Sequence, residues 1–288
     1  MLLCPACYSE YRTWDQVADH MSGLATMSES AHVMWLNRNL SKEELSKNEL
    51  GQRLSEMFSN EGSLLEWARN AVIRKIYSGP HPLILAMQKP TKEDLLGYVI
   101  EHQHFLKNWV RVLSSVIERT DRNDVIKYEL ENITTEFLGC SGPSHFELLM
   151  RMGESLGMRK EEIQSIGPLP STTKAIGEWR EISFKMGWQE TMGAMHSLEL
   201  IADRGISSYG AKMHYFNVKI LSSNDYPKEV KRFLGEGYSA DTYHSSEALS
   251  LVEKYAGSRQ SVQVAIIKSL DAVSSYFNAR LERAAMLR

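Results

Sequence analysis

The sequence predicts an all-α protein with a small N-terminal arm that binds zinc through Cys and His. Apolar residues recur at helical spacing along most of the 288 residues. Capping boxes, in which a hydroxyl residue precedes an acidic residue by three positions, open predicted helices at Ser41 and Thr91. No segment alternates between apolar and polar residues as a half-buried strand does. Helices must therefore pack on one another, as they do in a bundle.

The predicted helices follow one another between short breaks that contain Gly or Pro. The first follows the capping box at Ser41 and carries apolar residues through Leu45, Leu50 and Leu54. By the same spacing, helices are predicted over 45–58, 64–77, 95–117, 124–138, 145–156, 171–186, 189–201, 211–222, 227–256 and 259–287. We divide the chain into an arm, residues 1–40, and a helical domain, residues 41–288.

Composition and charge exclude several classes of protein. The net charge of −3 offers no basic surface for a nucleic-acid partner. The apolar runs are far shorter than the roughly 20 residues of a membrane span. The first residues lack the basic and apolar regions of a secretion signal, so we expect a cytoplasmic protein. Of the cysteines Cys4, Cys7 and Cys140, two form C-x-x-C, which favours metal or redox chemistry over a disulfide framework.

Four zinc-ligand side chains fall within the arm. Cys4, Cys7 and His20 have the C-x2-C-x12-H spacing of a Cys2His2 zinc finger, and His32 follows after a longer gap of 11 residues. So short a segment cannot fold on apolar packing alone, so a structural zinc ion is expected to hold it. Two alternatives remain open: an arm with idle thiols and incidental histidines, and a redox C-x-x-C. A single Arg within residues 1–36 argues against DNA contact.

A second group of ligand residues lies on separate predicted helices. Residues three apart on a helix share a face, so a carboxylate and an imidazole at this spacing can hold one ion. Fe(II) accepts mixed carboxylate and imidazole ligands and keeps open positions for O2. The pairs His196–Glu199 and Asp241–His244 have this spacing, and Glu136 and His145 come before them in the chain. We expect one or two iron ions inside the bundle, held by five of these residues: Glu136, His145, Glu199, Asp241 and His244. An accidental spacing of surface or hydrogen-bonded residues is the alternative.

Several segments resemble the heme-oxygenase-like superfamily, which includes the thiaminase II, pyrroloquinoline-quinone synthase and CADD-like di-iron oxidase group. The stretches 131–139 and 145–149 resemble its helix–loop–helix signature, which supplies a Glu and a His in the di-iron branch. A later helix of that branch carries H-x-x-x-D-x-x-H, and residues 237–244 match its Asp and its final His. The resemblance covers roughly residues 45–285 and implies a heme-oxygenase-like fold.

The first His of that motif is Gly237 in this chain. Its absence would leave one metal with too few ligands. His196, one turn before Glu199, is one candidate replacement, and the pair Glu101 and His104 is another. We therefore name Glu101, His104 and His196 as candidate catalytic residues. A site with one metal or none is the third possibility.

The resemblance implies three functions. The first is an iron-dependent oxidase that uses O2 on a small organic substrate. The second is a metal-free enzyme like thiaminase II or the quinone-cofactor synthase, although residues 194–208, where thiaminase II relatives carry a nucleophilic Cys, contain none. The third is a non-enzymatic protein that senses a ligand. Relatives of this fold commonly self-associate, so a homo-oligomer, a dimer or tetramer, is expected. Five Tyr and three Trp could line its cavity: Tyr98, Tyr209, Tyr215, Tyr238, Tyr243, Trp109, Trp179 and Trp188.

Overall fold

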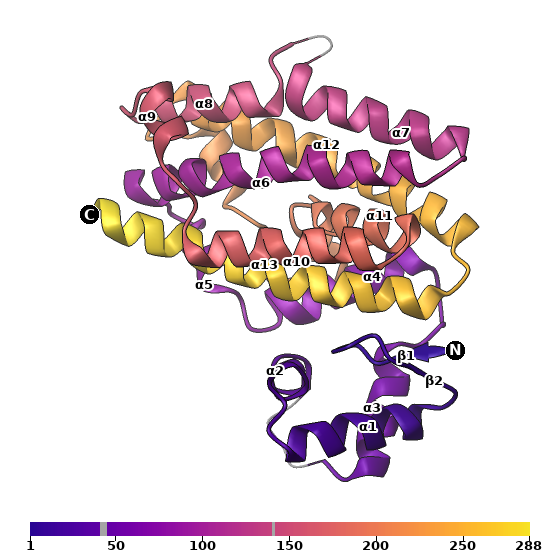
Figure 1. Ribbon diagram of the computed structural model, residues 1–288. Coiled ribbons are helices and arrows are strands. Elements are labelled where there is room, and N and C mark those ends of the chain that lie inside the picture. Colours follow the sequence, from indigo (N-terminus) through magenta and orange to yellow (C-terminus); the bar gives the residue numbers. More distant parts are fainter. Residues whose placement is uncertain (41–44, 140–141) are drawn as a thin grey trace.

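The computed structural model describes residues 1–40, 45–139 and 142–288, with the backbone but not the side chains of 239–244. It is a bundle of helices with a smaller helical arm at its N-terminal end (Figure 1). The all-α prediction is therefore confirmed. None of the described helices is both long and apolar enough to cross a membrane.

The arm contains two short strands and the first helices, and the bundle contains the rest (Figure 1). The arm runs β1 (Leu2–Leu3), β2 (Glu10–Tyr11), α1 (Trp14–Thr26), α2 (Ser30–Asn39) and α3 (Lys47–Met57). The bundle begins with α4 (Leu64–Val72), its π-helical continuation η1 (Ile73–Tyr77), α5 (Pro82–Ala86), α6 (Lys92–Glu118), α7 (Asn123–Ile133) and its π-helical continuation η2 (Thr134–Leu138). It continues with α8 (His145–Ser155), α9 (Lys160–Ser165), α10 (Pro170–Lys185), α11 (Trp188–His196) and the 3-10 turns η3 (Glu199–Ile201), η4 (Ile206–Tyr209) and η5 (Val218–Ser222). It ends with α12 (Lys228–Tyr255) and α13 (Arg259–Leu287).

Two local predictions need comment. The helix predicted over 211–222 is wrong, because only η5 forms there. The chain enters this segment through Gly210, whose φ of +108° is incompatible with a continuing right-handed helix.

The capping box predicted at Ser41 lies outside the described residues, and α3 begins with a capping box between Ser46 and Glu49. The capping box of Thr91 and Asp94 is confirmed.

Helix α13 is the central element of the bundle and packs on α6, α10 and α11. Its contact with α6 depends on Gly97. A Cβ at residue 97 would lie 2.5 Å from the carbonyl oxygen of Arg280 and 2.8 Å from the amide nitrogen of Ala284. Because those atoms are backbone, they cannot move aside as a flexible side chain could. Glycine therefore sets how closely the two helices approach.

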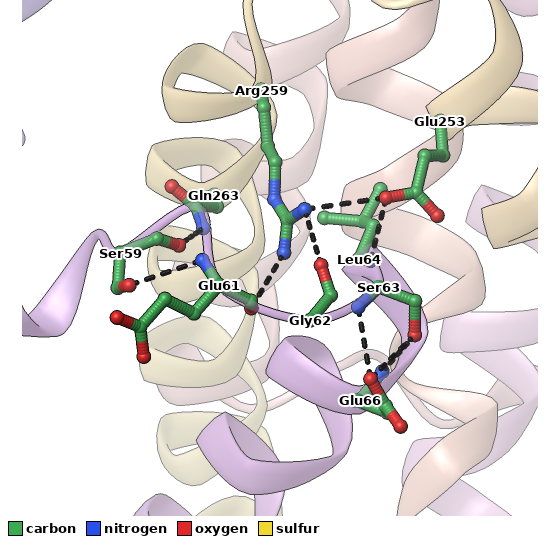
Figure 2. A network of polar contacts seen from close by, with 9 residues as sticks. All are labelled: Ser59, Glu61, Gly62, Ser63, Leu64, Glu66, Glu253, Arg259 and Gln263. Carbon is green, nitrogen blue, oxygen red and sulfur yellow. Dashed lines mark hydrogen bonds and ion pairs between the residues drawn. The ribbon is translucent and has the colours of Figure 1, made fainter.

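The segment 59–63 joins the arm to the bundle, and polar contacts with α12 and α13 fix it (Figure 2). Gln263 Nε2 donates a hydrogen bond to the Ser59 carbonyl oxygen at 2.7 Å. Arg259 Nη1 donates to the Gly62 carbonyl oxygen at 2.8 Å and lies 3.3 Å from Glu253 Oε1. These bonds satisfy backbone groups that a loop would otherwise leave to water.

The division at residue 40 stays a prediction. Helix α3, which we assigned to the helical domain, packs on α1 of the arm. A second contact ties the arm to the bundle at its other end, where the backbone of Leu3 exchanges two hydrogen bonds of 3.0 Å with the side chain of Gln260.

We predict that Gly97→Ala lowers the free energy of unfolding by about 1–3 kcal/mol, because the added methyl group must push α6 away from α13. The matched control is Gly177→Ala on α10, where an added Cβ meets no atom within 4 Å. That exposed mid-helix position should gain up to about 1 kcal/mol from helix propensity. Urea unfolding of both variants tests the prediction, and equal effects would contradict it.

Candidate zinc group and cavity of the helical domain

The four predicted zinc ligands of the arm come together. Cys4 Sγ lies 3.5 Å from His32 Nε2, Cys7 Sγ lies 3.2 Å from His20 Nε2, and the two Nε2 atoms are 3.1 Å apart. The four ligand atoms all lie within 4.8 Å of one another. Zn–S and Zn–N bonds of about 2.3 and 2.0 Å separate tetrahedral ligands by about 3.3–3.8 Å. The group therefore fits zinc.

The long gap between His20 and His32 has a structural explanation. His20 lies on α1 and His32 on α2, so the chain must turn between the two helices. It does so through Ser28, whose φ is +60°. Each histidine is thus presented by its own helix.

Glu29, which the sequence analysis did not single out, orients His32. Its Oε2 lies 2.5 Å from His32 Nδ1 and also accepts the backbone N–H of His32 at the start of α2. The side-chain hydrogen bond to His32 lowers the pKa of Glu29 to about 2, so the carboxylate is ionised. An N–H on Nδ1 leaves the lone pair of Nε2 for the metal, as in many zinc sites.

A cavity of about 150 Å³ lies inside the helical domain. Three of the five predicted iron ligands line it, Glu136, His145 and Glu199. Gly237 also lines it, at the position where the resemblance implies a His. Four of the predicted aromatic residues also line it, Tyr98, Trp109, Tyr215 and Tyr238. The full lining is as follows: Tyr98, His102, Phe105, Leu106, Trp109, Glu136, His145, Leu198, Glu199, Ile201, Ala202, Tyr215, Phe216, Phe233, Leu234, Gly237, Tyr238, Val273, Tyr276, Phe277 and Arg280.

The predicted iron ligands lie on four elements, η2, α8, η3 and α12. Glu136 lies in η2 and His145 at the start of α8, and Glu136 Oε1 is 2.8 Å from His145 Nδ1. Glu199 begins η3, and its Oε2 is buried without a hydrogen-bond partner in the part of the chain whose side chains are described. Asp241 and His244 lie on α12, and their side chains are outside the described part of the chain. Among described side chains, only the N-terminal group places three or more ligand atoms within 4.8 Å of one another. The iron site remains a prediction.

His196 lies between two carboxylates. Its Nε2 is 3.1 Å from Glu129 Oε1, and its Nδ1 is 3.1 Å from Glu199 Oε1. Burial alone would lower the pKa of His196, but the negative charges of Glu129 and Glu199 outweigh it and raise the pKa to about 10. With both ring nitrogens protonated and hydrogen-bonded, His196 has no lone pair for a metal. Its role in this structure is to hold Glu199 at the cavity wall.

Glu101 and His104 lie outside the cavity lining. The buried Glu101 carboxylate accepts hydrogen bonds from Thr172 Oγ1 at 2.6 Å and from Arg283 Nε at 2.8 Å. His104 Nε2 is 3.0 Å from the carbonyl oxygen of Ile166. Both therefore fix the segment before α10, and it is His102 on the same helix that faces the cavity.

The cavity wall also contains a buried arginine that no motif indicated. Arg280 on α13 is 2% exposed. Its Nη1 donates to Tyr215 Oη, and its Nη2 donates to Tyr276 Oη and to His102 Nδ1, the last at 2.9 Å. Burial and the positive charge of Arg280 lower the pKa of His102 well below its usual value. Tyr215 was among the predicted cavity residues, but no spacing in the sequence indicated Arg280 or Tyr276.

The comparison with protein families identifies the helical domain. The sequence profile of the TENA/THI-4/PQQC family matches residues 66–283. The chain belongs to this family. A C2H2-type zinc-finger profile matches residues 1–59, which include α3. No curated protein matches the chain.

Solved structures share the fold of this TENA/THI-4/PQQC protein at low sequence identity. A domain of unknown function with a heme oxygenase-like fold from Shewanella denitrificans has a TM-score of 0.59 at 16% identity. The alignment covers 85% of this chain and 96% of the Shewanella chain. A TenA homologue from P. horikoshii has a TM-score of 0.59 at 12% identity, covering 81% and 98%. A CADD-like protein of unknown function from Nostoc punctiforme has a TM-score of 0.53 at 17% identity, covering 82% and 97%. The predicted heme-oxygenase-like fold is confirmed.

We predict that Cys4→Ser removes zinc and unfolds the arm, because the ligand set loses a thiolate. Glu29→Gln should keep the ligands but weaken zinc affinity by about 10- to 100-fold, because His32 loses its ionised partner. Competition with a zinc chelator measures both effects. The matched control is Glu10→Gln, an exposed residue of the arm outside the ligand group. Equal zinc affinity in Glu29→Gln and the control would contradict the role of Glu29.

We predict that stability falls as the pH rises. The pKa of His196 is about 6.5 in an unfolded chain and about 10 in the fold, so its contribution is complete below pH 6.5 and is lost as the pH approaches 10. Burial also raises the pKa of Glu129, which gives the same sign. His196→Gln should be less stable at neutral pH and should flatten this alkaline dependence. Urea unfolding across this range tests it, and an unchanged slope in the variant would contradict it.

Proposed function

We propose that the cavity of the helical domain binds a small organic substrate beside an iron site, and that the protein is an iron-dependent oxidase. The observation that carries the proposal is the cavity itself, which is lined by Glu136, His145 and Glu199 together with several aromatic side chains. Buried carboxylates need a partner that offsets their desolvation, and Glu199 Oε2 has none among the described atoms.

The residues of this chain would prepare the metal ligands in defined ways. His196 donates to Glu199 Oε1 and so leaves Oε2 for a cation. Glu136 Oε1 lies 2.8 Å from His145 Nδ1, so the carboxylate would orient the imidazole ring. Asp241 and His244, four and seven residues after the cavity-lining Gly237 on α12, have the spacing of one helix face and would complete the set. When bound, iron would supply O2 activation.

The aromatic walls would hold the substrate and exclude water. Phe105 stacks with Tyr276 at a centroid separation of 5.3 Å, and Trp109 packs edge-on against His196 at 5.5 Å. Such rings give a dry, rigid surface for an organic body.

A metal-free enzyme of the thiaminase II or quinone-synthase type is the second candidate. Gly237 favours it, because the wall offers no imidazole at that position. In that case the buried pair of His196 and Glu199 would provide a fixed acid–base group at the cavity.

We predict that protein from iron-supplied cells contains iron in addition to zinc, and that Glu136→Ala loses the iron and keeps the zinc. The reason is that Glu136 lines the cavity and does not belong to the zinc group of the arm. Elemental analysis of iron and zinc measures the result. The matched control is Glu147→Ala on α8, which removes an exposed carboxylate paired with Arg151 and should retain both metals. Wild-type protein with zinc but no iron, and no Fe(II)-dependent O2 uptake, would favour the metal-free enzyme.

A further inference from the structure

Arg280 is a buried cation without an anionic partner. Its guanidinium lines the cavity and is almost fully enclosed. The buried Arg69 and the half-buried Arg283 are each paired with a carboxylate: Arg69 Nε lies 3.5 Å from Asp203 Oδ2, and Arg283 Nε lies 2.8 Å from Glu101 Oε1. Among the side chains that the structure describes, no carboxylate lies within 4.0 Å of Arg280. Its Nε is buried and has no hydrogen-bond partner among the described atoms.

The groups that do contact Arg280 are neutral. Tyr215 and Tyr276 accept its N–H bonds through their hydroxyl oxygens, and the guanidinium carbon lies 3.9 Å from the ring centroid of Tyr98. Burial raises the pKa of Tyr98 and Tyr276, so neither supplies a negative charge. The ring contacts offset part of the desolvation cost of the cation. They do not neutralise it.

The surroundings of Arg280 favour an anion for a second reason. Arginine only donates hydrogen bonds, so the hydroxyl of Tyr215 accepts from it and keeps its own proton to donate. His102 accepts from Arg280 at Nδ1, so its remaining ring proton is on Nε2 and can also be donated. The cluster therefore combines one positive charge with further donors, as anion-binding sites do.

We propose that Arg280, with Tyr215, recognises the single carboxylate of an apolar or aromatic monocarboxylic acid that occupies the cavity. This inference rests on the proposed function in assigning the cavity to a substrate. One guanidinium among neutral groups balances one negative charge. Glu136 and Glu199 line the same cavity and would repel a second acidic group. Phe105, Phe233 and Trp109 provide the apolar wall for the rest of the molecule.

The test is calorimetric titration of the full chain with benzoate, phenylacetate and hexanoate, each compared with its neutral amide, and with phenyl phosphate. We expect the carboxylates to bind and the amides to bind at least about 30-fold more weakly, because they leave the buried cation unpaired. Arg280→Met should lose at least about 30-fold in carboxylate affinity for the same reason. Tyr215→Phe, which keeps the cation, should lose roughly 5-fold.

The matched control is Arg288→Met, which removes the same charge from the exposed end of the same helix and should leave affinity unchanged. Equal binding of amides and carboxylates, unchanged affinity in Arg280→Met, or no binding by any carboxylate would overturn the proposal. Tighter binding of phenyl phosphate would overturn the carboxylate class in favour of a phosphate ester.

Titration of Glu136→Ala separates this inference from the proposed function. The variant is expected to bind no iron and still to bind the carboxylates, because Glu136 is not among the residues that contact the Arg280 guanidinium. Carboxylate binding without iron in any preparation would refute the oxidase and retain the Arg280 site. Iron binding without carboxylate binding would refute the Arg280 site and retain the proposed oxidase.

Discussion

The close approach of α6 and α13 is the constraint on which the rest of the helical domain depends. Gly97 allows the α6 backbone to lie against the carbonyl of Arg280, and no larger residue fits there without displacing one helix. The next turn of α6 carries Tyr98 and His102, which meet Arg280 and Tyr276 of α13. One wall of the cavity is thus a direct consequence of this helix pair.

Two buried charged clusters on the cavity wall solve the desolvation problem differently. His196 is held between the carboxylates of Glu129 and Glu199, so its positive charge is compensated within the protein. Arg280 is surrounded by phenols and an imidazole, and no carboxylate among the described side chains compensates its charge. A buried ion without a counterion is energetically costly. We therefore interpret the His196 cluster as structural support and the Arg280 cluster as a binding element.

The arm is stabilised by its zinc-ligand group, whereas the bundle is stabilised by a large apolar core. Its two-residue strands cannot form an independent sheet, and Val17 and Met21 are among few fully buried apolar side chains on α1. Four zinc ligands replace the missing core. Stacked aromatic rings of Trp35, Phe58 and Trp67 then continue the packing across the joint, where the 59–63 segment is held by α12 and α13 (Figure 2).

The sequence by itself determined the helical class, the zinc ligands and the family resemblance, because apolar periodicity, capping and ligand spacing are local properties of a chain. It also indicated Glu136, His145 and Glu199, which line one cavity. It indicated His104, whereas His102 of the same helix lines the cavity, because the face that a helix buries depends on its neighbours. Only the tertiary structure brought Arg280 to the cavity and placed His196 between two carboxylates, because the charges that surround a side chain come from residues distant in sequence.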